Sequence, residues 1–149
     1  MTIEDILTRE RTSCNLSLSS KKRAFEYIAD FIASSTANID ADELYEHLNQ
    51  REQLGSTGIG NGIAIPHCRC SNIDKTIGAL ITLSDPIDFD AVDNHPVDII
   101  FVLLVPEEAN DEHLKTLSHL AEQLDKISYR NQLRKTDSDE DLFLAALDY

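Results

Sequence analysis

The sequence lacks any hydrophobic segment long enough to cross a membrane. Its longest apolar run, from Ile99 to Val105, is far shorter than the roughly 20 residues that a transmembrane helix requires. The first residues, Met-Thr-Ile-Glu-Asp-Ile-Leu, include acidic side chains and no basic region ahead of an apolar stretch, so the pattern of a secretory signal is absent. We therefore expect a cytoplasmic protein without membrane insertion.

Basic residues are scarce, since 13 lysines and arginines stand against 27 aspartates and glutamates and the formal net charge is −14. Such a charge repels phosphate backbones and anionic lipid headgroups, so nucleic acid is not an expected partner. A protein partner with a basic face would instead be attracted, with an association rate that falls as the salt concentration rises.

Cysteine is also scarce, and its three copies, Cys14, Cys68 and Cys70, are an odd number that does not indicate a disulfide framework. Reduced thiols are the expected state in an apparently cytosolic chain. With 149 residues, of which 42% are hydrophobic, the chain can bury a core without disulfides. We expect a single domain over residues 1–149.

Glycine is rare except in one stretch. Four of the five glycines fall within residues 55–62, namely Gly55, Gly58, Gly60 and Gly62. Glycine permits backbone angles that other residues disfavour and lets another group approach bare N–H donors. The loop is therefore predicted to bind a phosphoryl group, with the N–H groups around Gly58 and Gly60 and the hydroxyls of Ser56 and Thr57 as ligands of its oxygens.

The residues after this loop, Ile63 to Ile65, form an apolar run that is too short for a helix and suits a buried strand. Pro66 has no N–H to continue a ladder, so the strand is expected to stop there and to present His67 at its end. Sites in open α/β sheets lie at the carboxyl ends of strands. His67 is therefore the first candidate for chemistry.

Hydrophobic periodicity predicts further elements on both sides of this stretch. A strand is expected around Cys14 to Leu18, after a polar segment 1–12 that gives little information. The apolar segment Val97 to Pro106 is expected to be a central strand that is buried on both faces. The remaining expected elements are helices at about 21–34, 40–54, 110–126, 129–134 and 138–147, and a strand at 77–84 that ends at Asp85-Pro86.

Spacing separates the five histidines. His113 shares the inward-facing side of its helix with the leucines that come after it, and it lies in the first turn, where the helix dipole disfavours an imidazolium. It is either a core histidine bonded to a backbone carbonyl or a partner of His67, where it would donate a hydrogen bond to a phosphoryl oxygen or to the second ring nitrogen of His67. His47 and His119 are expected on solvated helix faces, and His95 in a loop.

Three motifs follow one another along the chain: Arg51-Glu-x-Leu-Gly-Ser-Thr-Gly-Ile-Gly-Asn-Gly-Ile-Ala-Ile-Pro-His67, Pro96-Val-Asp-Ile-Ile-Phe-Val-Leu-Leu-Val-Pro106, and His113-Leu-x-Thr-Leu-Ser118. Together they resemble the IIA proteins of the phosphoenolpyruvate-dependent phosphotransferase system (PTS), in the fructose/mannitol class. The glycine stretch is most similar to the nitrogen-regulatory branch of that class. The resemblance covers the chain from about Ile3 to Leu147.

This resemblance implies a single α/β domain whose mixed parallel and antiparallel sheet is flanked by helices. The family histidine that takes a phosphoryl group through Nε2 from an HPr-like phosphocarrier matches His67. The second family histidine matches His113, and the active-site arginine, which we expect in the last turn of a helix, matches Arg51. The nitrogen branch is understood to signal by its phosphorylation state to transporters or sensor kinases. The alternative is relay of phosphate to a IIB domain for sugar uptake.

The same residues suit phosphoryl transfer, which depends mainly on positioning and charge stabilisation. An unperturbed imidazole is largely neutral near pH 7 and can act as a nucleophile, and Arg51 would offset negative charge on the phosphoryl oxygens. No cofactor or metal is expected. A zinc-binding or thiol-redox module is a third class, because Cys68 and Cys70 follow His67, but adjacent residues of an extended chain point in different directions. Cys68, where many relatives carry glycine, would make the site sensitive to oxidation.

Overall fold

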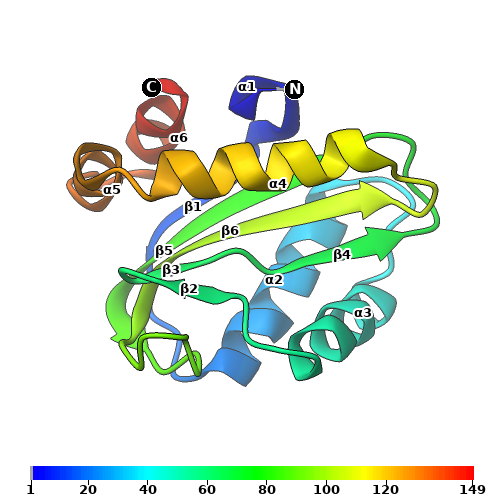
Figure 1. The fold of residues 1–149 in the computed structure, drawn as a ribbon, viewed down its shortest axis with the longest axis horizontal. Coiled ribbons are helices and arrows are strands. Elements are labelled where there is room, and N and C mark those ends of the chain that lie inside the picture. Colours follow the sequence, from blue (N-terminus) through cyan, green and yellow to red (C-terminus); the bar gives the residue numbers. More distant parts are fainter. Residues whose placement is uncertain (1) are drawn as a thin grey trace.

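The computed structural model describes residues 2–149 as a mixed sheet with helices on both faces (Figure 1). The helices are α1 (Ile3–Ile6), α2 (Lys21–Ser35), α3 (Ala41–Gln53), α4 (Asp111–Leu124), α5 (Ile127–Arg134) and α6 (Asp139–Leu147). The strands are β1 (Leu7–Leu16), β2 (Gly58–Gly60), β3 (Ile63–Ala64), β4 (His67–Cys70), β5 (Ile77–Ile87) and β6 (Val97–Pro106). No helix in this described part of the chain is long and apolar enough to span a bilayer.

Strand β6 is the centre of the sheet, as its apolar sequence predicted. The order is β1-β5-β6-β3-β2, and β4 pairs with β6 on the same edge as β3. Strands β5 and β6 are antiparallel, whereas β1 is parallel to β5, and both β3 and β4 are parallel to β6. The predicted mixed sheet is confirmed.

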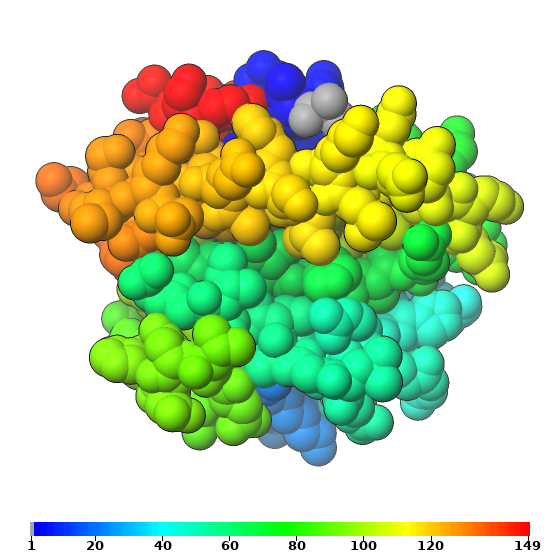
Figure 2. Space-filling view, in the orientation of Figure 1, coloured from blue at the N-terminus to red at the C-terminus, as the bar shows by residue number. Residues whose placement is uncertain are grey.

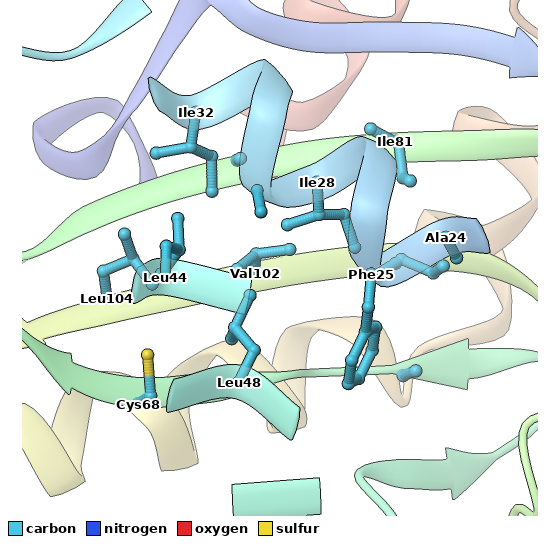
Figure 3. Close-up of a cluster of buried hydrophobic side chains, with 14 of the residues drawn as sticks. Ala24, Phe25, Ile28, Ile32, Leu44, Leu48, Cys68, Ile81, Val102 and Leu104 are labelled. Atoms are coloured by element: carbon cyan, nitrogen blue, oxygen red, sulfur yellow. The ribbon is translucent and has the colours of Figure 1, made fainter. Parts of the chain in front are cut away.

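Two hydrophobic layers hold the helices on the sheet. On one face, apolar side chains of α2 and α3 such as Phe25, Ile28 and Leu48 pack against the sheet (Figure 3). On the other face, α4, α5, α6 and the short α1 cover the sheet around Phe101. A strand with apolar residues on both faces needs both layers.

Side-chain caps explain where three of the long helices begin. The hydroxyl of Ser20 accepts from the N–H of Arg23 at 3.1 Å, and the carboxylate of Asp40 accepts from Glu43 at 2.9 Å. Asn110 caps α4 by accepting from the N–H of Glu112 at 3.1 Å. Each cap satisfies an N–H that has no partner within its helix. The first turn of α4 contains His113.

The first strand begins earlier than its sequence pattern indicated. We expected a strand around Cys14 to Leu18, but β1 covers Leu7–Leu16 and thus occupies much of the segment that appeared uninformative. Register shifts interrupt its pairing with β5 between Leu7 and Thr12, and these irregularities break the two-residue period in the sequence. Likewise β5 continues past Asp85-Pro86 to Ile87, with a register shift after Thr82 that accommodates the proline.

Pro66 does not end strand pairing, and this is a correction that bears on His67. Strand β3 stops at Ala64, but the carbonyl of Pro66 accepts the N–H of Leu103 at 2.9 Å, and β4 begins at His67 opposite Leu103. Proline lacks only the donor, so its carbonyl still joins the ladder. His67 is therefore the first residue of a paired strand rather than the end of one.

Candidate functional site

A cleft of about 850 Å³ lies where β4 forms the edge of the sheet between α3 and α4. Figure 2 shows this strip of surface, with β4 in green between α4 in yellow and α3 in blue-green. Arg51 from α3, His67 from β4 and His113 from α4 all line the cleft. The structure thus brings together the three predicted site residues from separate parts of the chain.

His67 is half-buried, and one hydrogen bond orients its ring. Its Nδ1 lies 2.9 Å from the carbonyl oxygen of Ile65. A carbonyl can only accept, so in the neutral ring Nδ1 carries the proton and Nε2 keeps its lone pair. Nε2 is therefore the nucleophilic nitrogen of this imidazole.

His113 is also half-buried, and its Nδ1 is hydrogen-bonded to the hydroxyl of the buried Thr76. The prediction that His113 faces another group is confirmed, although its partner is a side-chain hydroxyl rather than a backbone carbonyl. When Thr76 donates to Nδ1, the neutral ring carries its proton on Nε2. That N–H is the donor which a ligand in the cleft would meet.

Arg51 lies in the last turn of α3, as predicted, and its Nη1 donates to the carbonyl of Gly55 at 3.0 Å. This bond places the guanidinium at the end of the helix and on the wall of the cleft. The chain carries a net charge of −14, so a guanidinium at this position supplies local positive charge that an anion requires.

The predicted phosphate loop does not lie in the cleft. Among the residues that the structure describes, those lining the cleft do not include Ser56, Thr57, Gly58 or Gly60. The hydroxyl of Ser56 donates to the carbonyl of Phe89 at 2.8 Å and accepts the N–H of Gly58 at 3.1 Å. These groups are thus engaged within the fold and are not brought to His67.

Carboxylates of the chain itself accept from three donors of this loop. Glu52 accepts the N–H of Thr57 at 2.8 Å and its hydroxyl at 2.6 Å, and Asp93 accepts the N–H of Asn61 at 3.0 Å. Backbone hydrogen bonds from His95 and Asn61 lower the pKa of Asp93. The loop was predicted to bind a phosphoryl group, whereas in the structure these donors bond to Glu52 and Asp93.

Three further side chains at the cleft were not anticipated as site residues. Arg69 lies on β4 two residues after His67 and lines the cleft. We did not expect it at the site because the strand was predicted to stop at Pro66. His47, predicted to be a solvated surface residue, is half-buried and lines the cleft. Leu114 follows the helical period of the inward leucines, yet it is 60% exposed on the cleft wall.

Cys68 is among the residues that line the cleft, but the side chains of Cys68 and Cys70 are largely buried in the core. Side chains alternate along a strand, so Cys68 and Cys70 enter the core beneath α2 and α3, where Figure 3 shows Cys68 near Leu48. A hydrogen bond with Cys70 and burial both raise the pKa of Cys68. Within residues 2–149 no group of three histidine, cysteine or acidic side chains is arranged to hold a metal ion.

Comparison with known proteins agrees with this fold. Residues 5–147 match the family model described as phosphoenolpyruvate-dependent sugar phosphotransferase system, EIIA 2. A nitrogen regulatory protein of Pseudomonas aeruginosa is 47% identical over 146 residues, which cover 98% of this chain and 95% of that protein. A nitrogen regulatory protein of Escherichia coli is 41% identical over 142 residues, covering 95% of this chain and 86% of that protein.

Solved structures extend the comparison. The crystal structure of the nitrogen regulatory protein IIA-Ntr from Neisseria meningitidis has a TM-score of 0.90 at 38% identity and covers 97% of this chain and 98% of that one. IIA mannitol from Escherichia coli shares the fold, with a TM-score of 0.76 at 18% identity, and covers 94% and 98% of the two chains. The resemblance to the nitrogen-regulatory branch is confirmed, and the chain belongs to the EIIA 2 family of the phosphoenolpyruvate-dependent sugar phosphotransferase system.

Proposed function

We propose that His67 accepts a phosphoryl group at Nε2 from an HPr-like phosphocarrier, and that the phosphorylation state of His67 signals to transporters or sensor kinases in the cytoplasm. The observation that carries this proposal is the 2.9 Å bond between His67 Nδ1 and the carbonyl of Ile65. It leaves Nε2 as the nucleophilic nitrogen of a histidine that lines an open cleft.

In the proposed step, the lone pair of His67 Nε2 attacks the phosphorus of the carrier's phosphohistidine. A new N–P bond forms as the N–P bond to the carrier breaks, and the carrier's imidazole keeps the electron pair of that bond. His67 retains its Nδ1 proton, which the Ile65 carbonyl accepts. Charge on the three phosphoryl oxygens must be stabilised during transfer, and the proposed groups for this are the Arg51 guanidinium and the His113 Nε2–H.

Signalling follows from the charge that a phosphoryl group adds. Phosphorylation brings about −1.5 to −2 charges to a molecule whose formal charge is already −14. A partner that approaches the cleft with an acidic or apolar surface is repelled by the modified site, because charge is added where the partner must displace water. A partner with a basic surface gains affinity instead.

The decisive test is phosphoryl transfer in a mixture of phosphoenolpyruvate, the first enzyme of the system and the HPr-like carrier. Intact mass is measured at neutral or alkaline pH, since phosphohistidine is labile in acid. Wild type is expected to gain one phosphoryl group, His67→Ala none, and Arg51→Ala and His113→Ala the same group at a reduced rate. His119→Ala is the matched control, because His119 is on the exposed face of the same helix as His113.

Failure of wild type to be modified by a carrier that modifies another IIA protein would overturn the proposal. Phosphorylation of His67→Ala would also overturn it. Pull-downs then compare the proteins captured by His67→Ala with those captured by His67→Asp. If both variants capture the same partners, signalling by the phosphorylation state of His67 is contradicted. Efficient onward transfer to a IIB domain would favour sugar relay over signalling.

A further inference from the structure

Arg69 shares a strand and a face with His67. Because side chains alternate along β4, positions 67 and 69 point to one side while Cys68 and Cys70 enter the core. Strand β4 is held against β6, with His67 opposite Leu103 and Arg69 opposite Val105. Arg69 is exposed and lines the same cleft as His67.

The guanidinium of Arg69 holds the turn that leads into α4. Its Nη1 donates to the carbonyls of Glu107 and Ala109, both at 3.0 Å. Asn110, the next residue, caps α4. One cationic side chain on β4 therefore fixes the backbone of residues 107–110, which we call the β6–α4 turn.

The β6–α4 turn in turn sets the position of His113. The N–H of His113 donates to the carbonyl of Asn110 at 3.1 Å, so the first turn of α4 is built directly on the clamped segment. The side chain of His113 has one further anchor, the hydroxyl of Thr76. These bonds connect Arg69 to His113 through a backbone segment of only a few residues.

We infer that Arg69 is a positioning residue for phosphoryl transfer. It acts by holding the β6–α4 turn, and thereby keeps His113 on the wall of the cleft that His67 also lines. This inference rests on the proposed function for its kinetic consequence, but its structural part does not. Hydrogen bonds from a charged donor to a carbonyl are stronger than neutral ones, and two of them converge on this turn. Displacement of a positioning group by about 1 Å can lower a rate by about 100-fold.

The first experiment needs no phosphoryl transfer. NMR spectra of the unmodified wild type are compared with those of Arg69→Gln, with Arg51→Gln as a variant of a second arginine of the cleft and Arg23→Gln as a variant of an exposed arginine on α2. Only Arg69→Gln is expected to shift the imidazole signals of His113. The Ala109 amide donates to the carbonyl of Pro106 at 2.9 Å within the same turn. Its hydrogen exchange is expected to speed up by about tenfold in Arg69→Gln, which is the effect of losing roughly one net hydrogen bond.

The second experiment is a double-mutant cycle in the reconstituted transfer assay. Arg69→Gln is expected to slow phosphorylation of His67 by about 10- to 100-fold, with little change in the KM for the carrier and in the Tm. If Arg69 acts through His113, then Arg69→Gln combined with His113→Gln loses little more than His113→Gln alone. Arg23→Gln is expected to keep the wild-type rate.

Unmoved His113 signals in Arg69→Gln would overturn the inference, as would losses that multiply in the double variant, because Arg69 would then act independently of His113. An Arg51→Gln variant that shifts His113 equally would also overturn it. If wild type is never phosphorylated, the proposed function fails, while the NMR comparison still decides whether Arg69 positions His113.

Discussion

Glu52 is the centre of a buried polar cluster, and its replacement should reveal what the glycine loop does. Its side chain is 5% exposed and accepts from the Thr57 N–H, the Thr57 hydroxyl and the Lys21 ammonium at 2.8, 2.6 and 2.8 Å. Lys21 also donates to the carbonyl of Phe89 at 3.1 Å. The cluster joins the start of α2, the end of α3 and the glycine loop.

Glu52→Ala removes three charge-assisted bonds and leaves two donors of the buried Thr57 without an acceptor. Breaking a buried ion pair costs about 3–5 kcal/mol. Lys21 is 22% exposed and can turn to water, so we expect the lower end, about 3 kcal/mol. For a chain of this size that loss lowers the Tm by about 6–12 °C.

The assay is urea unfolding followed by far-UV circular dichroism, in which Glu52→Ala should lower the midpoint without changing the slope m. Lys21→Met is the companion variant. Its expected cost is smaller, about 1–2 kcal/mol, because Glu52 keeps both bonds from Thr57. A Glu52→Ala cost below about 1 kcal/mol would refute the reasoning, because that is the value of an exposed ion pair.

A second arm separates structural support from phosphate binding. Thr57→Val removes only the hydroxyl, and it keeps the backbone N–H and carbonyl of the loop. We expect it to be phosphorylated at the wild-type rate, because Thr57 is 4% exposed and faces Glu52 rather than the cleft. A tenfold slower transfer, on the order of 1.4 kcal/mol, with an unchanged urea midpoint would support the prediction that this loop binds the phosphoryl group.

Three further outcomes are expected. In urea titrations Gly62→Ala should destabilise the fold by about 1–3 kcal/mol, because Gly62 has φ +81° and an added Cβ would clash with the ion pair of Arg134 and Asp98. Gly55→Ala is the control and should be near neutral, because an added Cβ there meets nothing within 4 Å. Burial raises the pKa of Tyr129, so as the pH rises the unfolded chain loses its phenol proton before the folded chain does, and the free energy of unfolding should fall above about pH 10. Tyr129→Phe should make this fall shallower when unfolding is measured against pH. A hydrogen bond with Cys70 and burial raise the pKa of Cys68, so iodoacetamide should label Cys68 far more slowly in the native protein than in urea. Labelling is followed by peptide mass spectrometry, and equal rates in the two conditions would contradict the burial of Cys68.

Elements with strong patterns were predictable from the sequence because one local signal determines each of them. Strand β6 matches its predicted bounds, Val97 to Pro106, since an apolar run buried on both faces has few alternatives. Helix α6 begins after Ser138, whose hydroxyl accepts the N–H of Asp141 at 3.0 Å, as its capping sequence indicated. Arg51, His67 and His113 were found through motifs, and the structure brings them to one cleft.

The errors arose where a distant residue decides the outcome. Strand pairing continues beyond Pro66 because Leu103 donates to its carbonyl, and this partner lies 37 residues along the chain. Because this pairing was not predicted, Arg69 was not expected at the site. Arg69 lies on the same face as His67 only because β4 is a strand. The N–H of Asn61 is satisfied by Asp93, which no local pattern places there.

The hydrogen bonds of the glycine motif favour a positioning role over phosphate binding, and the Thr57→Val variant tests this interpretation. A series of bonds runs through it from Arg51 to His67. Glu52, next to Arg51, holds Thr57; the carbonyl of Thr57 accepts the N–H of Ile65 at 3.0 Å; and the carbonyl of Ile65 accepts from His67 Nδ1 at 2.9 Å. Glycines in this loop let the chain fold tightly enough for these bonds to form. The motif positions Arg51 and His67 relative to one another, and in the proposed function the phosphoryl group contacts these two residues, which line the cleft, rather than the loop between them.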